Sequence, residues 1–128
     1  MAVLFGGADS RETAILSSLV GTLGYAFQCE RSYAELDAQL QMNAFAAVIM
    51  DIDSFAVDNQ SIRHLAFAYP DTPILCISKN RLHPELSDSI QNHIFACLTK
   101  PIDQDELGYW LNCIRKDSRR LSCKEKPN

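Results

Sequence analysis

The feature that most constrains the fold is an unbroken apolar run in the middle of the chain. Residues 46–50 read Ala-Ala-Val-Ile-Met, and the run ends directly in Asp51. A strand with one face in water alternates apolar and polar side chains, whereas a parallel strand covered by helices on both faces is apolar throughout. The run therefore predicts a central strand of a parallel sheet, with Asp51 at its carboxyl end.

Strand and helix signals alternate on both sides of this run. Further strands are expected at residues 3–5, 25–29, 74–78 and 94–98. Helices are expected after the capping pairs Asp9/Glu12, Ser32/Glu35 and Asp103/Glu106, and over residues 59–69 and 84–92. Five strands alternating with five helices predict an α/β, flavodoxin-like (βα)5 fold, a doubly wound parallel sheet with strand order 2-1-3-4-5.

The first of these helices shows the pattern of a core-facing helix. Its buried stripe is expected to comprise Ile15, Leu16, Leu19, Val20 and Leu23, and Gly24 is expected to end it.

Length and charge favour one domain with a short tail. The 128 residues suit a single core, which we expect over residues 1–115. Residues 1–114 carry 6 Lys and Arg against 14 Asp and Glu, whereas residues 115–128 carry 6 against 2. Residues 116–128 therefore form a polar basic tail or the start of a linker, and we expect no nucleic-acid binding by this domain.

The lengths of the apolar stretches and the spacing of the cysteines indicate the cellular compartment and the kinds of site to expect. No run approaches the roughly 20 apolar residues of a membrane span, and we see no signal-peptide pattern, so a cytoplasmic protein is expected. The five cysteines show no C-x-x-C spacing and read as reduced core residues. The three histidines are scattered, which argues against structural zinc.

In the expected strand order, a ligand crevice lies at the carboxyl ends of the first and third strands. Asp51 falls in that crevice, which makes it the first candidate site residue. Ser78 closes the fourth strand, and Lys100-Pro101 follows the fifth.

These residues resemble the receiver domains of two-component response regulators, in a register that runs from Val3 to Ile114. The resemblance implies that Asp51 is the phosphoacceptor, that Ser78 and Lys100 contact the phosphoryl group, and that the Lys100-Pro101 peptide bond is cis. It also implies a histidine kinase or phosphotransfer protein as the donor, an output domain or protein as the regulated partner, and possible homodimers. Such a domain is a phosphoacceptor in phosphorelay signal transduction and at most catalyses its own phosphorylation and dephosphorylation.

The sequence departs from the family at the metal site. The acidic pair that holds magnesium in receivers is replaced by Gly7 and Ala8. A weakened magnesium site is expected from Asp9, Asp51 and Asp53, since magnesium prefers oxygen ligands. Two of these have simpler interpretations: Asp9 as the cap of the first helix, and Asp53 as a solvated loop residue.

Other departures concern the switch itself. Cys97 stands at the position of the aromatic switch residue, and Ser54-Phe55 replaces Met-Pro after the phosphoacceptor strand. Ser78 and Lys100 also have structural interpretations, as a turn former and an ordinary surface lysine.

Three functions therefore remain in view. The first is a phosphoacceptor receiver. The second is a pseudo-receiver that acts as a phosphorylation-independent protein-interaction module, which the Gly7-Ala8 pair favours. The third, a small flavodoxin-like enzyme or nucleotide binder, is disfavoured because no glycine-rich phosphate loop opens a helix and no Ser or Cys pairs with a plausible His base.

Overall fold

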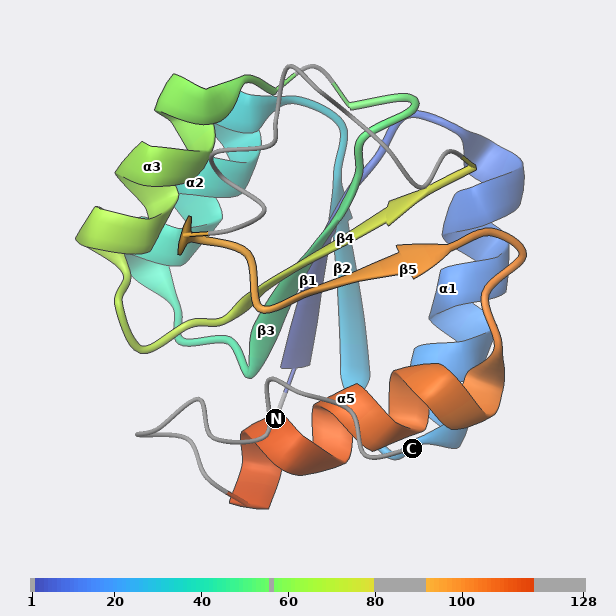
Figure 1. Ribbon diagram of the computed structural model, residues 1–128. Helices are drawn as coiled ribbons and strands as arrows, with labels where there is room; N and C mark the ends of the chain where they lie inside the picture. Colours follow the sequence, from blue (N-terminus) through green and yellow to red (C-terminus); the bar gives the residue numbers. More distant parts are fainter. Residues whose placement is uncertain (1, 56, 80–91, 117–128) are drawn as a thin grey trace.

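The structure is a computed structural model that describes residues 2–55, 57–79 and 92–116 (Figure 1). Five parallel strands form one sheet in the order β2-β1-β3-β4-β5. The strands are β1 (Ala2–Gly6), β2 (Ala26–Glu30), β3 (Ala47–Asp51), β4 (Ile74–Ser78) and β5 (Ala96–Thr99). The helices of the described residues are α1 (Ser10–Thr22), α2 (Tyr33–Met42), α3 (Asn59–Ala68) and α5 (Gln104–Lys116). The predicted fold class and strand order are confirmed, whereas residues 84–91 of the helix expected over residues 84–92 lie outside the described residues.

Helices cover both faces of the sheet. Helices α1 and α5 pack on one face, and α2 and α3 pack on the other (Figure 1). All five residues of β3 are buried, as its unbroken apolar sequence predicted. Neighbouring residues of β3 therefore contribute to opposite cores: Ile49 belongs to the cluster under α1 and α5, and Met50 to the cluster under α2 and α3.

The predicted helix caps are present. The Asp9 side chain accepts hydrogen bonds from the first turn of α1, and Ser32 accepts one from the Glu35 backbone N–H at 3.2 Å. Such caps satisfy amide groups that have no partner inside the helix. Gly24 follows α1 with a φ of 91°, a left-handed conformation that suits glycine.

Two expectations about local structure were wrong. Ile15 is 42% exposed, whereas Leu16 and Val20 are fully buried, because α1 presents a narrower stripe to the sheet than the apolar pattern suggested. Strand β5 begins at Ala96 rather than at residue 94. Ile94 and Phe95 are buried in opposite core clusters before the strand begins, so their apolar character is not a mark of the strand itself.

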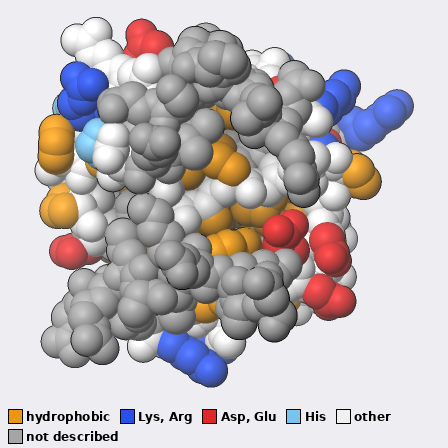
Figure 2. All heavy atoms as spheres, viewed as in Figure 1, with side chains coloured by type: hydrophobic (Ala, Val, Ile, Leu, Met, Phe, Trp, Pro, Cys, Tyr) orange, Lys and Arg blue, Asp and Glu red, His pale blue; other side chains and the backbone are white. Residues whose placement is uncertain are grey.

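Charges on α5 follow its backbone dipole. Asp105 and Glu106 lie in the first turn, and Arg115 and Lys116 lie in the last. Figure 2 shows the acidic side chains over the start of this helix and basic ones over its end. This arrangement stabilises a helix, because its amino end is partially positive and its carboxyl end partially negative. Within the described residues, no helix has the length and apolar character needed to cross a bilayer.

Neighbouring residues of α1 provide a matched test of the packing. We expect Leu16→Ala to lower the free energy of unfolding by about 2–5 kcal/mol, because it leaves a cavity in the core. Ile15→Ala should cost less than about 1 kcal/mol, since that side chain is already partly in water. Urea unfolding of both variants measures the difference, and equal losses would contradict the packing of α1.

Candidate functional site

The carboxyl ends of the strands bring three candidate residues to one edge of the sheet. Asp51 ends β3 and Ser78 ends β4. Lys100 follows β5, where its backbone N–H donates to the Ser78 carbonyl at 2.8 Å. The Lys100-Pro101 peptide bond is cis, as expected. Residues that are far apart in sequence therefore meet because parallel strands end at the same edge.

Asp51 is enclosed by hydrogen-bond donors. Its side chain is 0% exposed. Oδ1 accepts from the Lys100 ammonium at 2.8 Å and from the Asp53 backbone N–H at 3.1 Å, and Oδ2 accepts from the Ser54 hydroxyl at 2.9 Å. Both carboxylate oxygens therefore already have partners inside the protein.

Ser54 is a site residue that the sequence reasoning missed. Besides donating to Asp51, its hydroxyl accepts a hydrogen bond from the Ala8 backbone N–H at 3.1 Å. It thus links the segment after β1 to the carboxyl end of β3. The available signal was a hydroxyl three residues after an aspartate at a strand end, a spacing at which Ser and Asp side chains bond within a turn.

Lys100 is almost fully buried between two carboxylates. Its side chain is 7% exposed, and its amine lies 2.8 Å from Asp51 Oδ1 and 3.2 Å from Asp53 Oδ2. Burial alone lowers the pKa of Lys100, but the hydrogen bonds and charges of Asp51 and Asp53 outweigh it, so the pKa is raised. The ammonium form is therefore the one that this site stabilises.

Asp53 lies in an exposed turn, as its interpretation as a loop residue predicted, but its carboxylate is bound by donors of the protein and not by solvent alone. Its carboxylate accepts from the Ser78 hydroxyl at 2.8 Å, the Lys79 backbone N–H at 2.8 Å and the Lys100 amine at 3.2 Å. The chain turns directly after Asp51 instead of continuing as a strand, so alternation no longer decides where the side chain points. Partial burial raises the pKa of Asp53, but the hydrogen bonds from Lys79, Ser78 and Lys100 outweigh this, and the pKa is lowered.

Gly7, in the segment after β1, has no space for a side chain. A Cβ atom added to Gly7 would lie 2.6 Å from the Phe5 ring and 3.4 Å from the Asp51 Cβ. The acid on the first turn of α1, Glu12, has a raised pKa, mainly through burial, with Lys100 opposing and Asp51 adding to the increase. An additional carboxylate at Gly7 would therefore meet both a steric clash and negative charge.

The three carboxylates expected to hold magnesium are directed to other partners. Asp9 accepts from the Arg11 and Glu12 backbone N–H groups at 3.0 and 3.4 Å, as its interpretation as a helix cap predicted. Asp51 and Asp53 bind donors of the protein. In the described part of the chain, no group of three or more His, Cys, Asp or Glu side chains is placed to hold a metal. This donor set does not fit magnesium, because Asp51 and Asp53 face the Lys100 ammonium and Asp9 faces the amide groups of α1.

Cys97, at the expected switch position, lies outside this network. It pairs in register with Cys76 on the neighbouring strand β4, and it is exposed whereas Cys76 is buried. The hydrogen bond between the two thiols raises the pKa of Cys76 and lowers that of Cys97.

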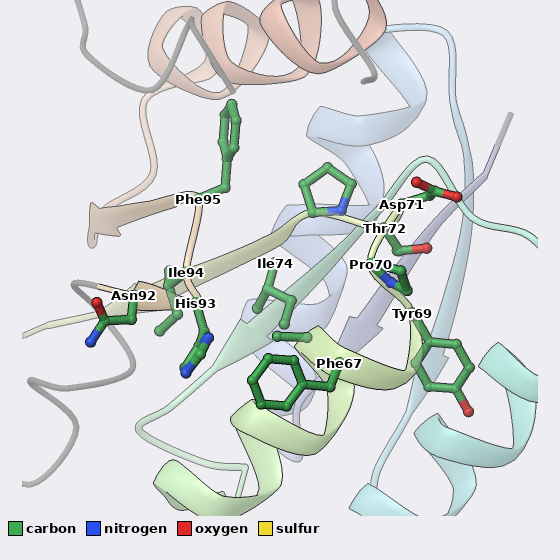
Figure 3. A pocket seen from close by; sticks show the side chains of 12 residues that line it. Phe67, Tyr69, Pro70, Asp71, Thr72, Ile74, Asn92, His93, Ile94 and Phe95 are labelled. Carbon is green, nitrogen blue, oxygen red and sulfur yellow. The ribbon is translucent and has the colours of Figure 1, made fainter. Parts of the chain in front are cut away.

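A separate hollow of about 220 Å³ lies at the opposite end of β4 from the Asp51 site (Figure 3). It is lined by the end of α3, the turn at residues 69–73 and residues 92–95. At its rim the Phe67 and His93 rings meet edge to face, with centroids 5.6 Å apart. Its lining is mainly apolar and includes none of the residues around Asp51.

Solved structures show what the fold is similar to. The signal receiver domain of an HD domain-containing protein from Pseudomonas fluorescens Pf-5 is 19% identical, covers 91% of this chain and 95% of its own, and has a TM-score of 0.80. The Francisella response regulator 1452 receiver domain is 18% identical, covers 92% of this chain and 98% of its own, and has a TM-score of 0.78. A third structure is the receiver domain of a sensor histidine kinase from Pseudomonas aeruginosa PAO1, with a magnesium ion coordinated in its active-site cleft. It is 18% identical, covers 87% of this chain and 93% of its own, and has a TM-score of 0.75.

No protein-family model and no curated protein matches the chain. The likeness in structure nevertheless shows that this chain has the fold of response-regulator receiver domains, as the resemblance in sequence predicted.

The Ser54 hydroxyl should contribute measurably to stability. We expect Ser54→Ala to lower the free energy of unfolding by about 1–3 kcal/mol, because it removes a partner from both the Asp51 carboxylate and the Ala8 N–H. Ser17→Ala, an exposed change on α1, is the matched control. Urea unfolding distinguishes them, and a loss no greater than the control's would show that the Ser54 link is dispensable.

Lowering the pH should weaken the hydrogen bonds and ion pair of Asp53, because its carboxylate becomes protonated. A carboxyl group whose folded-state pKa is lowered stabilises the fold above its unfolded pKa, near 3.8, and loses this effect as the pH falls through the folded value. We therefore expect the wild type to be more stable than Asp53→Asn near neutral pH, and the difference to shrink between about pH 5 and about pH 2. Urea unfolding across this range measures it, with Asp105→Asn, an exposed acid, as control. Parallel curves for the wild type and Asp53→Asn would contradict the role of this carboxylate.

Proposed function

We propose that this domain is a receiver-fold signalling module that acts by protein–protein contact, without accepting a phosphoryl group. The observation that carries the proposal is the complete burial of Asp51, with three protein donors on its two oxygens. A carboxylate that attacks phosphorus needs a lone pair that is open to the incoming group and aligned with the leaving oxygen. Oδ1 of Asp51 already accepts two hydrogen bonds, and the remaining lone pair of Oδ2 is enclosed because the side chain is 0% exposed.

The charge of the site also favours this proposal. Phosphoryl transfer needs cations that neutralise the transferring oxygens. The Lys100 ammonium already forms ion pairs with two carboxylates, those of Asp51 and Asp53. Gly7 and Ala8 supply no carboxylate that could bind a metal ion. A phosphoryl group would bring about two further negative charges into this site.

A second candidate is the phosphoacceptor receiver, with a histidine kinase or phosphotransfer protein as donor and an output protein as target. It is favoured by the 2.8 Å contact between Lys100 and Asp51 and by the Ser78 hydroxyl at the end of the neighbouring strand. In this case the Ser54 hydroxyl must rotate away from Asp51 Oδ2, and Asp53 must release Ser78 and Lys100.

Incubation with acetyl phosphate and magnesium separates the two candidates. We expect no increase in mass corresponding to one phosphoryl group in the wild type, because Asp51 is enclosed and the metal ligands are replaced. Intact-protein mass spectrometry makes the measurement, with a receiver domain that carries the acidic pair as positive control. An adduct that forms on the wild type and is absent from Asp51→Asn would overturn the proposal and establish the phosphoacceptor.

A further inference from the structure

We infer that the Asp53 carboxylate fills the pocket that would hold the oxygens of a phosphoryl group on Asp51, so that the domain carries its own anion in this place. The inference rests on the proposed function and extends it. A site that only lacked a metal would still present empty donors to an incoming oxyanion. In this chain the donors around the site are already bound to a carboxylate.

Three donors of different kinds meet at Asp53. The Ser78 hydroxyl donates to Oδ1 at 2.8 Å, the Lys79 backbone N–H donates to Oδ2 at 2.8 Å, and the Lys100 amine lies 3.2 Å from Oδ2. A hydroxyl, a backbone amide and an ammonium that converge on one point form a site for oxyanions, and the same set would serve phosphate oxygens. These donors come from the ends of β4 and β5, whereas Asp53 comes from the segment after β3.

The position of this pocket follows from the lysine that it shares with Asp51. One ammonium group is 2.8 Å from Asp51 Oδ1 and 3.2 Å from Asp53 Oδ2. A phosphoryl group bonded to an Asp51 oxygen would extend its own oxygens toward this ammonium, since that is the charge that stabilises them. The Asp53 carboxylate therefore lies where those oxygens would be.

Electrostatics and burial support the assignment. The lowered pKa of Asp53 shows that its hydrogen bonds outweigh the effect of burial, so the ionised form is the one bound. The Asp53 side chain is 22% exposed, whereas those of Asp51 and Lys100 are at 0% and 7%. Asp53 thus covers the network from the side that faces solvent.

This arrangement has a consequence for signalling. In a switchable site, a hydroxyl and an ammonium group move when a new anion arrives and so change a neighbouring surface. In this chain Asp53 binds Ser78 and Lys100 without a phosphoryl group, so the edge formed by β4 and β5 does not need an incoming anion to hold these two side chains together. A protein partner that reads this edge would find the same surface with or without a phosphate donor.

The test removes the internal anion and offers an external one. Backbone amide spectra of the wild type, Asp53→Ala and the exposed-acid control Asp105→Asn are recorded during titration with inorganic phosphate. We expect a saturable shift of the Lys79 amide in Asp53→Ala, with an apparent affinity about tenfold or more above that of the wild type and the control, because only this variant frees the donors. Asp53→Asn, which keeps the shape of the side chain, provides the same comparison if Asp53→Ala does not fold.

The result that would overturn the inference is an equal response of the Lys79 amide in the wild type and the Asp53 variants, including no response in any of them. The proposed function is tested separately: a phosphoryl adduct on Asp51 in the mass-spectrometry experiment would contradict it. The two measurements use different atoms and different reagents, so a failure of the inference can be distinguished from a failure of the proposed function.

Discussion

The buried ion pair between Lys100 and Asp51 is the interaction on which the rest of the site depends. Its two side chains are 7% and 0% exposed, with the charged atoms 2.8 Å apart. Removing two charges from water costs several kcal/mol each, and their attraction offsets this only when the remaining donors and acceptors are also satisfied. The Asp53 backbone N–H and the Ser54 hydroxyl complete the shell of Asp51. The ion pair therefore fixes the turn after β3 and joins it to the end of β5.

The residues that follow β1 are consistent with the rest of the site in physical terms. Two carboxylates at Gly7 and Ala8 would add negative charge beside Asp51 and Asp53, with one buried lysine to balance it, and such a cluster requires a metal ion. Without them, the Phe5 ring packs against Gly7 and the Ala8 N–H binds the Ser54 hydroxyl. The glycine at position 7 and the Ser54 link thus belong to one arrangement, in which internal hydrogen bonds organise the site.

The sequence predicted the sheet and part of the site for the same reason. An apolar strand that ends in Asp51, and strand ends at Ser78 and Lys100, place three side chains at one edge as soon as the sheet is parallel. The contacts of Asp53 and Ser54 were not predictable in this way, since they lie in a turn where alternation no longer applies. Only the tertiary structure decides which donors such side chains meet. Ile15 illustrates the same limit on a helix, because the width of a buried stripe is set by packing and not by the apolar pattern.

The presence of Asp51, Ser78 and Lys100 has a structural explanation that is independent of phosphoryl transfer. Replacing Lys100 by a neutral residue would leave Asp51 as a buried charge without its cation, a change that typically costs about 3–5 kcal/mol. Replacing Ser78 would remove a partner from Asp53, which in turn neutralises part of the Lys100 charge. Each residue is therefore needed by the others for stability. The ion-pair network that they form holds the strand ends together, and this role does not require phosphoryl chemistry.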